Sequence, residues 1–198
     1  MSELSLGFAD PVTEAQQVFG AVMNALSRPG RPQALHTALE PPRPLTPELA
    51  AVALALADHE APIWLDAELA ASPSVIAFLR FHTGATIVND PGQAAFALIA
   101  DPEQRLPIEL FALGTAEYPD RSTTLIFAVS ELSNAEGWGL EGPGIASRES
   151  LRASPWPRDL AAIVQANRTL FPRGLDVLLA SPGRVVGLPR STRIVEEN

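Results

Sequence analysis

The sequence predicts an α/β fold in which a mixed β-sheet is covered on both faces. Short β-branched or aliphatic runs lie between turn residues, and longer segments with apolar residues at helical spacing separate many of these runs. Strands that alternate with helices favour a layered α/β domain. A chain of 198 residues without an internal repeat or a break in composition is expected to form one domain, residues 1–198.

The first helix has start and stop signals. Asp10 supplies a capping carboxylate directly before Pro11, which suits the first helical position, and apolar residues then recur at helical spacing. Because Pro29 disfavours helical geometry at the residue before it, this helix is predicted to end near Ser27.

Three further helices are predicted in the same way. A Thr-Pro-Glu sequence at residues 46–48 opens an alanine-rich helix, and a Ser-Pro pair at residues 72–73 opens another that Gly84 closes. A last helix is predicted over residues 157–170, before Pro172 stops it. The strands are predicted from the short apolar runs at residues 61–65, 85–88, 94–99, 123–129, 175–179 and 184–188.

Composition excludes several classes of function. The net charge of −9 argues against a nucleic-acid partner, because neutralising phosphates requires a basic face. The chain has no cysteine, which excludes disulfides and thiolate metal sites. All 14 basic residues are arginine, so no lysine is present to form a Schiff base with pyridoxal phosphate or to complete a phosphate-binding loop.

The sequence also predicts a cytoplasmic protein without a membrane span or metal site. The longest apolar run, residues 49–57, is about half the length that crosses a bilayer, and the first residues lack a leader pattern. The three histidines show no metal-ligand spacing, and no nucleophile elbow surrounds a serine.

Three arginines are candidates for anion binding. Arg121, Arg173 and Arg190 each lie in a turn that contains proline, beside a predicted strand, from which a guanidinium group can hold oxyanions bidentately. The alternative is that each arginine pairs with Asp120, Asp176 or an acidic residue of a partner subunit.

Two glycines and one aspartate complete the candidate anion-binding or interface set. Gly142 and Gly144 belong to a Gly-Pro-Gly turn that can present backbone N–H groups to an anion, or simply connect two strands. Asp176 opens a predicted strand, where a carboxylate commonly accepts hydrogen bonds from turn N–H groups.

Eight short motifs occur in an order that resembles one family, the H subunit (PhnH) of the bacterial carbon–phosphorus lyase system. They are FADPV (8–12), ALSRPG (25–30), PIWL (62–65), LRFHT (79–83), YPDRSTT (118–124), GPGI (142–145), FPRGLD (171–176) and LPRST (188–192). Each motif alone is a common turn, and only the ordered set, which spans nearly the whole chain, is specific.

The resemblance implies a fold, a set of partners and a function. The fold is expected to be a three-layer α/β/α sandwich similar to the large domain of pyridoxal-phosphate-dependent transferases, without the cofactor. The chain is expected to be a homodimeric accessory subunit of the carbon–phosphorus lyase core complex, with the G, I, J and L subunits as partners. Together with the G, I and L subunits it would support transfer of the ribose triphosphate of ATP to an alkylphosphonate, with release of adenine.

Two alternatives remain open from the residues themselves. One is a stand-alone enzyme or binding protein that takes a small anionic metabolite in an arginine-lined pocket. The other is a packing module without a ligand.

Overall fold

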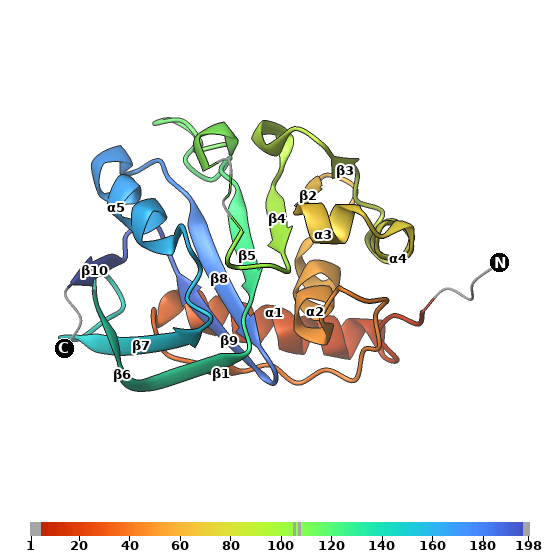
Figure 1. Ribbon diagram of the computed structural model, residues 1–198, viewed down its shortest axis with the longest axis horizontal. Helices are drawn as coiled ribbons and strands as arrows, with labels where there is room; N and C mark the ends of the chain where they lie inside the picture. Colours follow the sequence, from red (N-terminus) through yellow and green to blue (C-terminus); the bar gives the residue numbers. More distant parts are fainter. Residues whose placement is uncertain (1–4, 105, 107, 196–198) are drawn as a thin grey trace.

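The computed structural model of the protein describes residues 5–195, except Arg105 and Pro107. Within these residues a seven-stranded sheet has the order β1-β9-β8-β5-β4-β2-β3 (Figure 1). Its strands are β1 (Gln33–Ala34), β2 (Ile63–Leu65), β3 (Ile87–Val88), β4 (Phe96–Ile99), β5 (Thr124–Ala128), β8 (Asp176–Ser181) and β9 (Arg184–Leu188). Neighbours from β8 to β3 are parallel, whereas β9 is antiparallel to β8 and to β1. The predicted mixed sheet is confirmed.

The four predicted helices lie close to their predicted positions, and the structure adds a one-turn helix, α3 (Ala67–Ala70), that was not predicted. The four are α1 (Pro11–Ser27), α2 (Pro47–Leu56), α4 (Pro73–Thr83) and α5 (Leu160–Leu170), and short 3₁₀ turns occur at Pro91–Gln93 and Ile108–Leu110. Asp10, Thr46 and Ser72 cap α1, α2 and α4 as predicted. Hydrogen bonds from Thr13 lower the pKa of the Asp10 carboxyl group, because they favour its ionised form.

The last helix begins three residues later than predicted. Its N-cap residue is Asp159, but the side chain makes no capping hydrogen bond. The carboxylate instead accepts a hydrogen bond of 2.8 Å from the backbone N–H of Leu106. A tertiary contact therefore competes with the local cap at this helix start.

A second, three-stranded antiparallel sheet was not predicted. It has the order β10-β6-β7 and consists of β6 (Glu131–Glu141), β7 (Glu149–Ser154) and β10 (Arg193–Val195). The pairing of β6 with β7 shifts register between Ser133 and Trp138, so the apolar alternation that marks a strand is interrupted there. One outer layer of the molecule is therefore part helix and part sheet, which corrects the expected all-helical layer.

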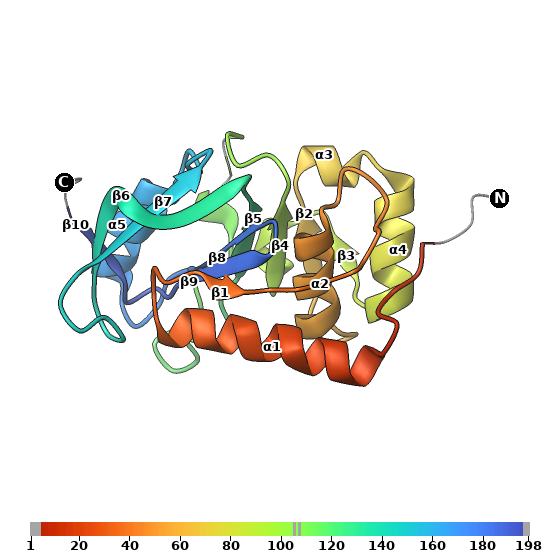
Figure 2. The same cartoon turned by 90° about the horizontal axis from the view of Figure 1, so that it is seen from below.

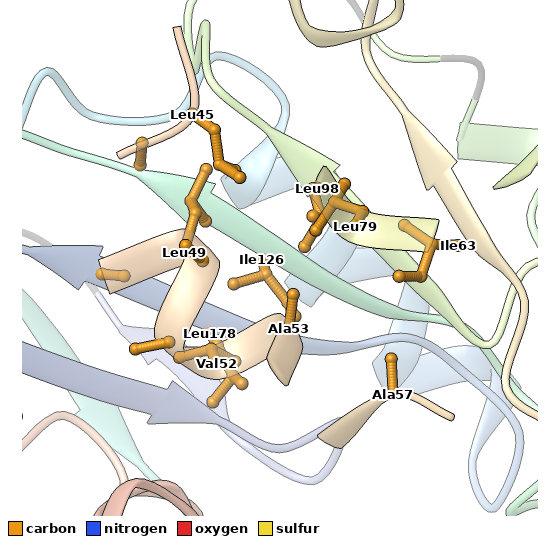
Figure 3. Packing of buried hydrophobic residues seen from close by; sticks show 14 of the residues in the cluster. Leu45, Leu49, Val52, Ala53, Ala57, Ile63, Leu79, Leu98, Ile126 and Leu178 are labelled. Atoms are coloured by element: carbon orange, nitrogen blue, oxygen red, sulfur yellow. The ribbon is translucent and has the colours of Figure 1, made fainter. Parts of the chain in front are cut away.

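The central sheet is buried on both faces. In β5, Ile126 packs with α1, α2 and α4, whereas its neighbours Leu125 and Phe127 pack with α5 and the small sheet. Figure 2 shows α1 on the opposite side of β8 and β9 from β6 and β7. Figure 3 shows how Leu49 and Val52 of α2 pack against the sheet residues around Ile126. None of the helices in the described part of the chain is long and apolar enough to cross a membrane.

A buried carboxylate lies where the strand order reverses, between β2 and β4. Asp66 follows β2 and has no exposed surface. Its oxygens accept hydrogen bonds from the N–H groups of Leu69 at 2.9 Å, Ala100 at 2.8 Å and Asp101 at 3.0 Å. In open α/β sheets the crevice at such a point often binds a ligand. Here the Asp66 carboxylate joins the carboxyl ends of the two strands.

Candidate functional site around Arg190

The densest polar cluster in the described residues centres on Arg190, just beyond the end of β9. The antiparallel pairing of β8 with β9 places Val177 opposite Leu188, which brings Arg190 close to Asp176 at the start of β8. Asp176 accepts hydrogen bonds from the Arg190 backbone N–H at 2.8 Å and from Nε at 3.2 Å. A third bond, from Nη2 to the other carboxylate oxygen, completes the ion pair.

Two more chain segments accept hydrogen bonds from the same guanidinium group. Nη1 donates to the carbonyl oxygens of Pro119 at 2.5 Å and Pro172 at 3.4 Å, and Nη2 donates to Ser122 Oγ at 2.6 Å. A guanidinium group has five N–H donors, and all five are engaged. Arg190 therefore joins the loop before β5, the turn after α5 and the start of β8.

Asn167 holds the same turn from the other side, a role that sequence reasoning missed. Its side-chain amide donates to the Leu175 carbonyl oxygen and accepts from the Leu175 N–H group, each at 2.8 Å. Asn167 is 3% exposed and occupies a position of the apolar helical pattern of α5. The sequence did contain a signal for this role: a polar residue on a helix face that is predicted to be buried. Because a buried amide needs hydrogen-bond partners, such a residue is expected to bond to a neighbouring segment.

The cluster lies at the amino edge of the parallel strands. Thr124 of β5 is paired with Asp176 of β8, and both residues open their strands. Ligands of open α/β sheets bind beyond the opposite, carboxyl edge. The position of the Arg190 cluster therefore suits a role in organising surface loops.

The other predicted site residues are dispersed. Arg121 stacks on the Tyr118 ring at 4.4 Å from its centre, and Arg173 is exposed in the turn after α5. Gly144 has a positive φ of 86°, and an added Cβ would lie 2.6 Å from the carbonyl oxygen of Ser27, so the loop requires glycine there. The structure brings together Arg190 and Asp176, and Gly142 and Arg190 both line one hollow.

This hollow has a volume of about 610 Å³ and is formed by three segments. The β6–β7 loop contributes residues 141–147, the end of α5 contributes residues 167–171, and residues 190–193 close the third side. The Gly-Pro-Gly turn lies in the connection between β6 and β7. Among the residues that the structure describes, no three His, Asp or Glu side chains gather to hold a metal ion.

The fold and site define an α/β protein with a mixed sheet, in which a polar cluster around a single arginine, Arg190, joins surface loops. Residues 6–195 match the family of bacterial phosphonate metabolism proteins, PhnH. A curated relative from Rhizobium meliloti (strain 1021), alpha-D-ribose 1-methylphosphonate 5-triphosphate synthase subunit PhnH, is 40% identical over 190 residues, which cover 96% of this chain and 94% of the relative. The chain belongs to the PhnH family, and the family resemblance of the ordered motifs is confirmed.

Proposed function

We propose that this chain is an accessory subunit of the enzyme that transfers the ribose triphosphate of ATP to an alkylphosphonate and releases adenine. It would act in the cytoplasm with the G, I and L subunits, in a core complex that also contains the J subunit. The observation that carries this proposal is the 40% identity, over 96% of the chain, to a subunit of alpha-D-ribose 1-methylphosphonate 5-triphosphate synthase.

The arrangement of the arginines supports an accessory role. Arg190 uses all of its side-chain donors to hold loops together, and Arg121 and Arg173 lie in separate turns. Triphosphate transfer requires cations that converge on the oxygens where charge develops. These three arginines offer no such convergent set for catalysis by the isolated chain.

We further propose that the single domain has the fold of the large domain of pyridoxal-phosphate-dependent transferases. Because the chain contains no lysine, it is expected not to form an aldimine with that cofactor. Incubation with pyridoxal phosphate, borohydride reduction and mass spectrometry would check this. A reduced cofactor bonded to a side chain would contradict the expectation.

We propose that the chain forms a homodimer through α1. Val12, Phe19 and Met23 lie within roughly 40° of one another around the helix, and all three are exposed, Phe19 and Met23 by 48% each. Glu14 is the only charged residue of α1 in a chain of net charge −9. A second copy would be repelled at acidic surfaces, whereas this uncharged apolar face suits self-association.

Sedimentation of two variants tests the dimer. Phe19→Glu combined with Met23→Glu should give monomers at micromolar concentration, because each copy would bring two charges to the contact. The control, Gln17→Glu, adds a charge on a different exposed flank of α1 and should leave the dimer intact. Equal sedimentation of the double variant and the native chain would argue against this surface.

Reconstitution tests the accessory role. The chain would be incubated with MgATP and methylphosphonate, alone and with the other subunits, and adenine release would be followed by chromatography. We expect release only from the complete mixture, loss of release when this chain is omitted, and recovery when it is returned. Sustained release by the chain alone would instead support the rival reading, a stand-alone enzyme.

A further inference from the structure

The hollow described above is lined by two arginine side chains that do not take part in the Arg190 cluster. We call it the Arg168 hollow; its walls include Arg168 and Phe171 of the α5 end, Glu141 and Ile145 of the β6–β7 region, and Thr192 and Arg193. Arg168 and Arg193 also line an adjoining hollow of about 270 Å³. The larger volume, about 610 Å³, falls in the range of sites for small organic molecules.

The two arginines are available for a ligand. Within the described ranges the Arg168 guanidinium group has no hydrogen-bond or ion-pair partner, and the residue is exposed. Arg193 lies 4.0 Å from Glu141, the limit of an ion pair, and its side chain is 56% exposed. Such a pair is weak, because water screens both charges. Apart from Arg190, whose donors are engaged, the hollow therefore presents two guanidinium groups against one carboxylate, in a chain whose acids outnumber its bases.

A buried hydroxyl group gives a second, independent indication. Thr192 is 3% exposed, and its Oγ1 atom finds no hydrogen-bond partner among the residues described. A buried hydroxyl group without a partner costs free energy, so native proteins rarely retain one without a reason. An acceptor atom of a ligand in the hollow would supply the missing bond after a small adjustment of the wall.

Part of the remaining wall is apolar. Phe171 is 64% exposed, although large aromatic side chains are usually buried, and Pro143 and Ile145 line the same hollow. A planar apolar group could cover the Phe171 ring and remove it from water. The combination of an aromatic surface with two arginines suits an organic anion better than a free inorganic ion.

We propose that the Arg168 hollow binds a small organic anion. Arg168 and Arg193 hold its oxyanion, the Thr192 hydroxyl group donates a hydrogen bond to it, and its planar body rests on Phe171. This site goes beyond the accessory role proposed above and does not depend on it, since binding is measured on the chain alone, without other subunits and without turnover.

Three probes distinguish the chemistry of the ligand. Phenylphosphonate, benzoate and the neutral benzyl alcohol would be titrated into the full chain at low salt, with calorimetry and NMR as readouts. Phenylphosphonate and benzoate decide between phosphorus and carboxylate oxyanions, and binding of either one supports the proposal. Binding of benzyl alcohol as tight as that of both anions would overturn it, because the arginines would then contribute nothing.

Variants assign the binding to the named residues. Arg168→Gln and Arg193→Gln should each weaken anion binding about tenfold, the loss expected for a charge-assisted hydrogen bond. Glu141→Gln should tighten binding a few-fold, because it frees Arg193 from its only described acidic neighbour; a gain of affinity cannot come from misfolding. The control Arg80→Gln removes an exposed arginine of α4, far from the hollow in sequence, and should change nothing.

Thr192→Val separates ligand binding from stability. The variant removes an unpartnered hydroxyl group at nearly constant shape, so the free chain should be no less stable in urea, while the anion binds more weakly. Unchanged anion affinity in Arg168→Gln and Arg193→Gln would overturn the site, and unchanged affinity in Thr192→Val would overturn the role of its hydroxyl group.

Discussion

Asp176 and Arg190 are joined by three hydrogen bonds, although they lie 14 positions apart in the sequence. The contact follows from the β8–β9 hairpin, which returns the chain to the start of β8. Both side chains are largely buried, with 23% of Asp176 and 14% of Arg190 exposed. The pair therefore links the geometry of the sheet to the loops that surround it.

Replacement of Arg190 should be strongly destabilising. Arg190→Ala leaves the Asp176 carboxylate and the Pro119 carbonyl oxygen with fewer partners, and we expect a loss of about 2–4 kcal/mol in the free energy of unfolding. Arg190→Lys should recover only part of it, because an ammonium group cannot reproduce the five-donor fork. Urea denaturation measures both. The exposed neighbour Arg173→Ala should stay within about 0.5 kcal/mol of the native chain, and an equal loss there would contradict this assignment.

Gly174 should tolerate no side chain. Its φ is 142°, and an added Cβ would lie 2.3 Å from Asn167 Oδ1, which accepts the Leu175 N–H bond. Gly183 has a φ of 72° but nothing within 4 Å of an added Cβ. Gly183→Ala should therefore cost about 1 kcal/mol through backbone strain alone, and Gly174→Ala clearly more. Similar thermal midpoints for the two variants would show that the contact with Asn167 does not matter.

Replacement of Asp66 by asparagine should destabilise the chain far more than the same replacement at an exposed aspartate that also accepts a backbone hydrogen bond. Asp66→Asn turns a side-chain amide donor toward backbone N–H groups, so we expect a loss of about 3 kcal/mol. Asp58 also accepts a backbone hydrogen bond, from Glu60 at 2.8 Å, but it is exposed. Asp58→Asn should therefore change the stability very little. Scanning calorimetry of both variants measures the difference. Comparable melting temperatures for the two variants would argue against a stabilising role for the hydrogen bonds by which Asp66 joins the ends of β2 and β4.

Replacement by alanine should change the stability in opposite directions at Gly187 of β9, which packs against α1, and at Gly20 within α1. At Gly187 of β9 an added Cβ would lie 2.7 Å from backbone atoms of Ala25 and Leu26, so Gly187→Ala should push α1 off the sheet and cost several kcal/mol, roughly the size of a severe core defect. Gly20, within α1, has nothing within 4 Å of an added Cβ. Gly20→Ala should stabilise the chain by about 0.5–1 kcal/mol through helix propensity. Denaturation with guanidinium chloride measures the free energy of unfolding of both variants. A Gly187→Ala variant as stable as the native chain would contradict the close contact.

The helix starts and the buried strands were predictable because their signals are local. A capping side chain before a proline acts within one turn, as at Asp10, and an apolar run such as β5 is buried wherever it pairs. The small sheet was not predictable in this way. Its β10 strand is three residues long and takes its place only by pairing with Glu141 to Gly139 of β6, far away in the sequence.

The sequence by itself determined the family, through the order of its motifs, and it determined the absence of lysine chemistry and the succession of most helices and central strands. Only the tertiary structure decided what the candidate site residues do. A turn arginine can hold an anion or a neighbouring carboxylate, and its sequence context is the same in both cases. The β8–β9 hairpin brings Asp176 to Arg190, and Pro119 and Ser122 of the loop before β5 engage other donors of the same side chain. No described residue does so for Arg168. The difference between these two arginines arises from contacts between segments far apart in the chain, which local sequence patterns do not encode.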